Sequence, residues 1–236
     1  MTTFATRRTD IVARVHAACR AAGRDPASVR LLAASKTRTP GDVVEALETG
    51  HLLFGENRAQ ELRDKSKALL GHRPAPEWHF IGPLQRNKVR YVVGVARLIH
   101  AVDSLRLARE ISKRAVLLRD RGDLSDPVGV LIEVNIGQEA SKAGVVAADA
   151  LELAREVDAM SHVAVRGLMC IPPAVDDPEE AAPYFEAMAA LAREGRQSGL
   201  LLDELSMGMS GDFEVAIRHG ATMVRVGTAL FGPRRT

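Results

Sequence analysis

The chain has 236 residues, of which 46% are hydrophobic, so it can form one large domain such as an α/β barrel of roughly 200 to 250 residues. Its formal net charge is +2, and its 32 basic and 30 acidic residues are interspersed, which argues against the concentrated basic face of a nucleic-acid-binding protein. No stretch approaches the roughly 20 apolar residues of a membrane span, and the N-terminal segment lacks the apolar core of a signal peptide. We therefore expect a cytoplasmic protein with neither nucleic-acid nor membrane partners.

Short apolar or β-branched runs alternate with amphipathic segments along the chain. An N-terminal helix is expected at about residues 7–22. Eight strands are predicted at residues 29–36, 52–56, 78–82, 98–102, 128–135, 163–170, 204–207 and 223–230. Helices are predicted at 40–49, 58–70, 85–93, 105–119, 147–160, 178–198 and 212–219. This alternation predicts a single (β/α)8 TIM-type barrel over residues 1–236, with the additional N-terminal helix; a doubly wound open sheet is the alternative.

In such a barrel the chemistry lies at the C-terminal ends of the strands, and polar residues follow the predicted strands at those ends. The first strand ends in Ser35 and Lys36. A lysine at this position can be partly desolvated, which lowers its pKa and prepares it to form a Schiff base with an aldehyde. Considered alone, it is more often a solvated lysine. The residues expected at the same mouth are Asn57, His79, Asp103, Asn135 and Met169.

The ends of the last two strands indicate an anion site. SMGMSGD places the hydroxyls of Ser206 and Ser210 among glycines just before a helix, so that backbone N–H groups can face an anion. RVGT adds Arg225, Gly227 and Thr228 on the eighth strand, as in many barrel phosphate sites. Each motif alone is commonly just a turn. Barrel closure brings them beside Lys36, which suits an aldehyde that bears a phosphate.

The segments that carry a family resemblance cover nearly the whole chain. They are ASKT, FGENRAQE, WHFIGPLQRNK, AVDS, EVNIGQEASKAG, RGLMCIPP, LSMGMSGDFEVAI and VRVGTALFG. Together they resemble the motifs of the pyridoxal phosphate homeostasis protein family, of the YggS/PROSC type. The resemblance implies a barrel related to the N-terminal domain of alanine racemase. It also implies a protein that binds pyridoxal 5′-phosphate without established turnover and balances the supply of vitamin B6.

The resemblance also assigns roles to residues. It implies a Schiff base on Lys36, phosphate contacts from Ser210, Arg225, Gly227 and Thr228, and ring-side positions for Asn57 and His79. Ser206 is expected to reach either the phosphate or the ring nitrogen, and Met207 and Met169 are expected to pack against the ring. His79 has equal weight as a ligand contact and as a structural hydrogen-bonding residue.

Two positions beside these motifs stand apart. Lys142 corresponds to a lysine that is suspected of assisting cofactor transfer in the family, although a solvated loop lysine is the plainer interpretation. Arg58 replaces an aromatic residue that is frequent there, which affects the expected contacts near Asn57.

No catalytic residue and no metal ligand is predicted. Racemases of this fold need a second base, a tyrosine from a further domain, whereas this chain ends soon after the last strand and its Tyr91 and Tyr184 fall in predicted helices. Cys19 and Cys170 are expected to be reduced thiols. A weak racemase or other pyridoxal phosphate enzyme and a Schiff-base aldolase are the alternatives. A monomer is expected because a closed barrel has no free sheet edge, and apo-enzymes that need the cofactor are the expected partners.

Overall fold

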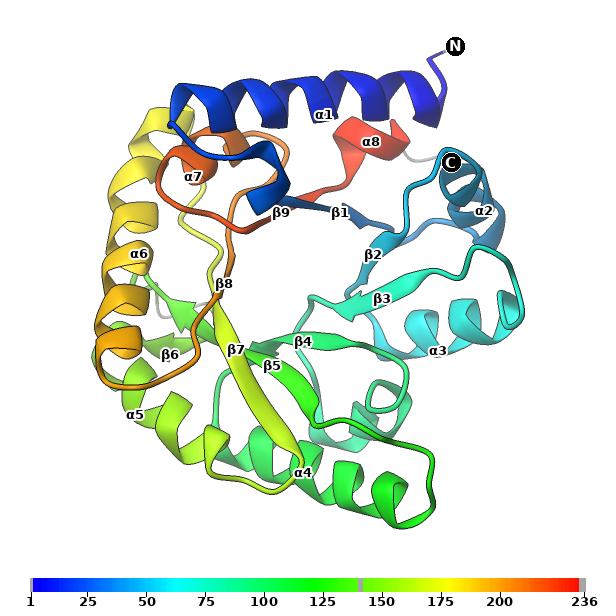
Figure 1. The fold of residues 1–236 in the computed structure, drawn as a ribbon, viewed down its shortest axis with the longest axis vertical. Coiled ribbons are helices and arrows are strands. Elements are labelled where there is room, and N and C mark those ends of the chain that lie inside the picture. The colour runs from blue at the N-terminus through cyan, green and yellow to red at the C-terminus, as the bar shows by residue number, and fades with distance from the viewer. Residues whose placement is uncertain (1, 140–141, 234–236) are drawn as a thin grey trace.

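Eight parallel strands close into a barrel that a layer of helices surrounds (Figure 1). The computed structural model describes residues 2–139 and 142–233. The barrel strands are β1 (Arg30–Ala34), β2 (Leu53–Glu56), β3 (Glu77–Phe80), β4 (Leu98–Val102), β5 (Val128–Asn135), β7 (Val163–Met169), β8 (Glu204–Ser206) and β9 (Met223–Val226). Neighbouring strands pair in parallel around the ring, and pairing of β1 with β9 closes it. The predicted TIM-type barrel is confirmed.

The helices cover the outside of the barrel. They are α1 (Phe4–Ala21), α2 (Pro40–Glu48), α3 (Ala59–Ala68), α4 (Leu105–Asp120), α5 (Ala147–Asp158), α6 (Ala182–Gln197), α7 (Phe213–Arg218) and α8 (Thr228–Phe231). Three 3-10 helices are η1 (Pro26–Ser28), η2 (Arg86–Tyr91) and η3 (Pro178–Ala181). The expected N-terminal helix is α1, which lies across α7 and α8 in Figure 1. Its Phe4 ring lies 5.0 Å from the Phe231 ring, so α1 covers the seam where the barrel closes.

Local sequence signals explain where the helices begin. Thr39 and Asp42 form a capping box at the start of α2, and Pro40 occupies the first turn, where a missing N–H does no harm. The Ser104 hydroxyl accepts a hydrogen bond from the Leu107 backbone N–H at the start of α4. These caps place the loops that leave β1 and β4, and therefore the residues at the strand ends.

Three elements differ from the expectation. The eighth barrel strand ends at Val226 rather than at residue 230, because the chain turns at Gly227 and continues as α8. The segment expected as a helix at residues 85–93 is the 3-10 helix η2. A further two-residue strand, β6 (Val145–Val146), pairs with the end of β5 outside the barrel ring and was not predicted.

The buried side chains form two apolar clusters, because successive residues of a strand face opposite sides of the sheet. The larger cluster lies between the strands and the helices. The smaller fills the barrel interior and consists of Leu32, Ala34, Leu53, Leu98, Ala101, Leu131, Met169 and Met223. His79, His100, Ser206 and Arg225 are also buried, and they form the polar part of the core described below. No helix among the described residues is long and apolar enough to cross a membrane.

Candidate functional site

Barrel closure places Lys36 beside Gly227 and Thr228. Ala33 on β1 is in register with Val226 on β9, so the residues that follow both strands leave the barrel together. A Cβ atom at Gly227 would lie 3.3 Å from the carbonyl oxygen of Ala34, which favours glycine at this close approach. Lys36 is exposed, and its amine has no hydrogen bond or ion pair with any other residue that the structure describes. The amine is therefore available to a ligand.

The residue after Lys36 has a strained backbone. Thr37 has a φ of 64°, in the left-handed region that β-branched residues rarely adopt. Its backbone N–H donates to Glu61 Oε2 on α3 at 3.0 Å. Such strain persists where the surroundings fix it, and it is concentrated at functional sites. Here it sharply redirects the chain as Lys36 leaves β1.

A buried ionic cluster lies directly below this turn. It consists of Ser35, Glu56 and Lys65, and the Ser35 hydroxyl and the Lys65 ammonium each donate to Glu56 Oε1 at 2.6 Å. The ammonium also donates to the Ser35 carbonyl at 2.8 Å. Burial raises the pKa of Glu56, and Lys65 and Ser35 oppose that rise. The cluster joins β1, β2 and α3 beneath Lys36.

Asn57 follows the same strand end. Its Oδ1 atom is buried and has no hydrogen-bond partner within the described residues. The backbone around it is tightly packed, because a Cβ atom at Gly82 would lie 2.5 Å from the Asn57 carbonyl oxygen. A buried acceptor without a partner is costly, so Asn57 is a candidate to receive a donor from a ligand.

The loop after β8 is where the anion site is predicted. Gly208 has a φ of +91°, and a side chain there would meet Ala216 on α7, so the turn requires glycine. The Gly208 carbonyl accepts a hydrogen bond from the Arg225 backbone N–H at 2.9 Å, which holds this loop against β9. Ser210 is half-buried, and its hydroxyl bonds to no other described residue. Since α7 has only six residues, an anion at this loop would depend on local hydroxyl and N–H groups more than on a helix dipole.

Arg225 lies inside the barrel rather than at this loop. Its guanidinium donates to the carbonyl and the hydroxyl of Ser206, at 2.6 and 2.7 Å, and to the carbonyl of Cys170 at 2.9 Å. Burial lowers the pKa of Arg225, although arginine stays charged at any ordinary pH. Alternation along β9 turns Arg225 inward like Met223, and its phosphate contact stays a prediction.

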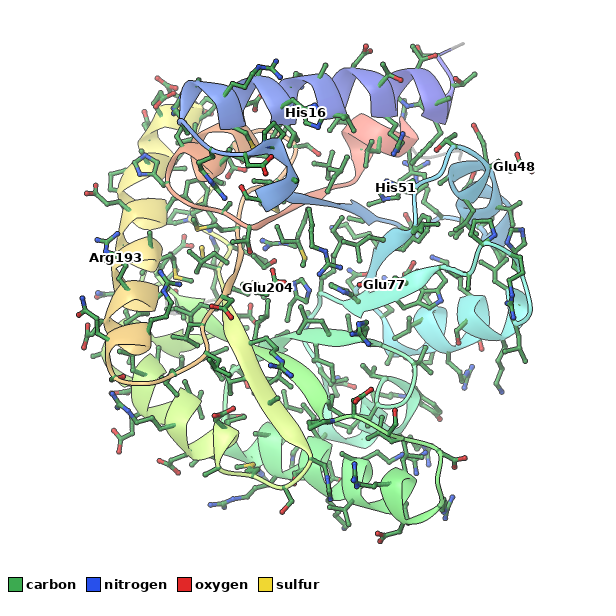
Figure 2. All side chains as sticks on the ribbon, viewed as in Figure 1. His16, Glu48, His51, Glu77, Arg193 and Glu204 are labelled. Carbon is green, nitrogen blue, oxygen red and sulfur yellow. The ribbon has the colours of Figure 1, made fainter. Side chains whose placement is uncertain are left out.

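His79 does not lie at the mouth with Lys36. It faces a cavity of about 430 Å³ at the N-terminal end of the barrel, which the first residues of several strands also line. Its two ring nitrogens lie 3.0 Å from Glu77 Oε1 and 3.0 Å from His100 Nε2. Figure 2 shows Glu77 and Glu204 on opposite sides of the space inside the barrel, from β3 and β8. The structure therefore places His79 at the opposite end from its expected ring-side position.

The two predicted methionines face different ways. Met207 belongs to the larger cluster between strands and helices, because it follows the inward-facing Ser206 by one residue. Met169 belongs to the interior cluster, at the end of β7. Of the two, only Met169 faces the barrel interior.

Other residues at the mouth were missed or assigned no role. Glu133 on β5 is buried, and burial with the nearby charge of Asp103 raises its pKa to about 7, while Arg225 opposes that rise. The sequence signal was available, because a single charged residue inside an apolar strand is unusual unless it faces a polar interior. The same signal applies to His100 in the run LIHAV.

Lys142 and Arg58 both have partners on the surface. The Lys142 ammonium donates to the Pro172 carbonyl at 3.0 Å and forms an ion pair with Glu139. It also lines a cavity of about 320 Å³ together with Gly211, next to the anion loop. Arg58 is exposed and pairs with Glu61 at 3.3 Å.

Comparison with known proteins agrees with this fold. A family described as "Alanine racemase, N-terminal domain" matches residues 11–235. The pyridoxal phosphate homeostasis protein of Aquifex aeolicus is 45% identical over 230 residues, which cover 97% of each chain.

Solved structures give the same relationship. The structure of PipY from Synechococcus elongatus with pyridoxal phosphate bound is 35% identical, with a TM-score of 0.78, and the match covers 94% of this chain and all of that one. Alanine racemase from Corynebacterium glutamicum is 18% identical with a TM-score of 0.68, and the match covers 61% of that chain, which shows the fold alone. The chain therefore belongs to the pyridoxal phosphate homeostasis protein family, whose barrel is that of the alanine racemase N-terminal domain.

Proposed function

We propose that this protein binds pyridoxal 5′-phosphate reversibly and contributes to its homeostasis without turning over a substrate. One observation carries the proposal: the first and last barrel strands bring Lys36, whose amine has no partner among the described residues, beside Gly227 and Thr228. PipY, with the cofactor bound, and relatives named for pyridoxal phosphate homeostasis support the same conclusion.

The residues at the mouth fit this cofactor. When bound, pyridoxal phosphate supplies an aldehyde that condenses with an amine and a phosphate that requires hydrogen-bond donors. Lys36 provides the amine, and its ammonium has no competing partner among the described residues. Ser210, Gly227 and Thr228 would hold the phosphate through hydroxyl and N–H groups. Asn57 offers a buried acceptor that has no partner in the described part of the chain.

Arg225 and Ser206 take a different place in this proposal. Both are buried inside the barrel and bond to each other, so they would support the cofactor from below the mouth and leave the phosphate to the loops. This assigns Ser206 to the ring side, which the sequence left open. Arg225 would supply positive charge from the interior.

A holding role follows from the groups around the mouth. Tyr91 and Tyr184 lie on η2 and α6, in the outer layer, so neither is placed as a second base opposite Lys36. The exposed Lys36 favours exchange of the cofactor over trapping of a reactive carbanion. Delivery to apo-enzymes that need the cofactor, a monomeric state and a role of Lys142 in transfer remain predictions.

The decisive experiment is the absorbance spectrum of the purified protein with and without pyridoxal phosphate, followed by borohydride reduction and peptide mass mapping. We expect a band at longer wavelength than that of the free aldehyde and a phosphopyridoxyl adduct on Lys36. Lys36→Ala should abolish both, whereas Lys113→Ala, which alters an exposed lysine on α4, should keep both. Unchanged covalent binding by the Lys36→Ala variant would contradict the proposal.

Turnover is tested separately. Amino acids incubated with the loaded protein in heavy water should gain no α-deuterium at rates that would count as catalysis. Rapid incorporation that depends on Lys36 would instead indicate a pyridoxal phosphate enzyme.

A further inference from the structure

A line of hydrogen bonds runs through the barrel from its N-terminal end to Arg225. Glu77 Oε1 lies 3.0 Å from His79 Nε2, and His79 Nδ1 lies 3.0 Å from His100 Nε2. His100 Nδ1 lies 2.9 Å from the Ser206 hydroxyl, to which the Arg225 guanidinium donates at 2.7 Å. We call these five residues the interior chain.

The interior chain crosses the side-chain-filled interior of the barrel rather than running along neighbouring strands. His100 is on β4 and Ser206 is on β8, and two other strands, β5 and β7, separate these strands in the ring. A bond between them therefore spans the interior. One end of the interior chain faces the N-terminal cavity, and the other lies in the C-terminal half of β9.

Both ends impose the same direction on the hydrogen bonds. A carboxylate can only accept, so Glu77 requires a proton on His79 Nε2 and leaves Nδ1 of the neutral ring as an acceptor. His100 must then donate from Nε2 and accept at Nδ1 from the Ser206 hydroxyl. From the other end, Arg225 can only donate, so Ser206 accepts from it and passes its own proton toward His100. Every member is satisfied with two neutral histidines.

Burial is consistent with neutral rings. Both histidines are buried, and desolvation lowers the pKa of each; for His79, Glu77 opposes that shift. Outside the interior chain, Glu77 pairs with Arg30 at 2.5 Å, and Arg30 also lies 3.6 Å from Glu204. The negative end is therefore held at the N-terminal cavity and the positive end near the mouth.

We propose that His79 and His100 are positioning residues, which orient Ser206 and Arg225 beneath the cofactor through this directed chain anchored at Glu77. The proposal rests on the proposed function, because the mouth must hold pyridoxal phosphate for the orientation to act on it. The direction of the hydrogen bonds in the interior chain does not depend on the proposed function, since the two histidine tautomers are fixed in the cofactor-free protein.

The first test is a nitrogen–proton correlation spectrum of the imidazole rings in the cofactor-free protein. We expect both His79 and His100 as neutral tautomers protonated on Nε2 at neutral pH, and the ring of exposed His16 gives a reference signal from outside the interior chain. An Nδ1–H tautomer or a positive charge on either buried ring would overturn the direction of the chain.

The second test uses two carboxylates at the same end of the barrel. Glu77→Leu removes the terminal acceptor, whereas the control Glu204→Leu removes a carboxylate that also lies near Arg30 but bonds to Thr222 instead of the interior chain. Glu77→Leu loses one hydrogen bond to a charged group, so it should bind the cofactor about tenfold more weakly and shift the absorbance band. The control Glu204→Leu should weaken cofactor binding about twofold or less.

Equal effects of the two variants, or no effect of Glu77→Leu, would overturn the positioning role. His100→Leu should show a larger band shift if it folds, but the Glu77 comparison decides the matter without it. If the unaltered protein showed no cofactor band, the proposed function and the positioning role would both fail, and the tautomers would still decide the direction.

Discussion

The two ends of the barrel treat their polar residues in opposite ways. At the N-terminal end, Arg30, Glu77 and His79 bond to one another and onward into the interior. At the mouth, the side chains of Lys36, Ser210 and Thr228 make no hydrogen bond with other residues that the structure describes. The polar side chains at the N-terminal end therefore satisfy one another's hydrogen bonds, whereas those at the mouth are available to a ligand. Polar side chains without partners among the described residues thus gather at the mouth and not at the N-terminal end.

The carboxylates show the same contrast. Glu133 at the mouth is destabilised as an anion, with its pKa raised to about 7, whereas hydrogen bonding to His79 and the charge of Arg30 lower the pKa of Glu77 to about 2. Carboxyl groups with shifted pKa values are concentrated at functional sites. Four substitutions test how far the contrast holds.

The largest effect should come from the support beneath the mouth. Lys65→Met leaves the Glu56 carboxylate buried without its cation, and breaking such a pair costs about 3–5 kcal/mol. Denaturant unfolding should show this loss, while Lys67→Met on the exposed side of α3 should change stability little. Similar stabilities for the two variants would mean that the structure at the mouth does not depend on the buried ionic cluster of Ser35, Glu56 and Lys65.

The next largest effect should be a gain in the free energy of unfolding. The Glu133 pKa in the folded protein lies above its ordinary value of 4.5, so its ionisation reduces stability as the pH rises from 4.5 to 7. Glu133→Gln removes that loss and should stabilise the protein by up to about 3 kcal/mol at pH 8, with little change at pH 4. Unfolding curves at both pH values test it, and destabilisation at pH 8 would reverse the assignment.

Glu77, the carboxylate at the N-terminal end, should affect stability with the opposite pH dependence. The Glu77 pKa lies below 4.5 in the folded protein, so its contribution is present above pH 4.5 and lost as the pH falls toward 2. Glu77→Gln should lower stability at pH 7 by about 1 kcal/mol, a value reduced because the side chain is partly exposed. The difference from wild type should vanish in acid; a stabilised variant at pH 7 would break the contrast.

The smallest effect concerns the turn at Lys36. Thr37→Gly relieves the left-handed strain, and after the flexibility of glycine is deducted we expect a gain of about 0.5–1 kcal/mol. Binding of pyridoxal phosphate should weaken, because Lys36 loses a fixed exit from β1. Gln138→Gly, at another left-handed position, is the control and should leave binding unchanged. Tighter binding by the Thr37 variant would show that the strain opposes the site.

Much of the fold was accessible from sequence because its signals are local and repeated. Apolar runs fixed the eight strands, and closure of a barrel then required Lys36 to meet Gly227 and Thr228. Helix α8 was missed because Thr228–Phe231 continues the apolar pattern of β9, and Gly227, although a common turn residue, was assigned to the anion site.

The unexpected side-chain placements at the site come from the stagger of tilted strands and from side-chain alternation, whereas the predicted cofactor contacts stay predictions. His79 is near the end of its strand in sequence, but tilted strands do not end at one level, and it lines the cavity at the N-terminal end of the barrel. For Met207 and Arg225, the prediction depended on whether each side chain faces the barrel interior or the surrounding helices. Alternation from Met223, inside the barrel, would have turned Arg225 inward.

Pairing of β1 with β9 also has a consequence for the synthesis of the protein. Lys36 leaves the ribosome before Gly227 and Thr228, which emerge only after the other barrel strands have been made. Contacts between such distant segments form late in folding, since the loop that they close is long. A nascent or truncated chain therefore has the reactive lysine without the phosphate site, and cofactor retention becomes a property of the completed barrel.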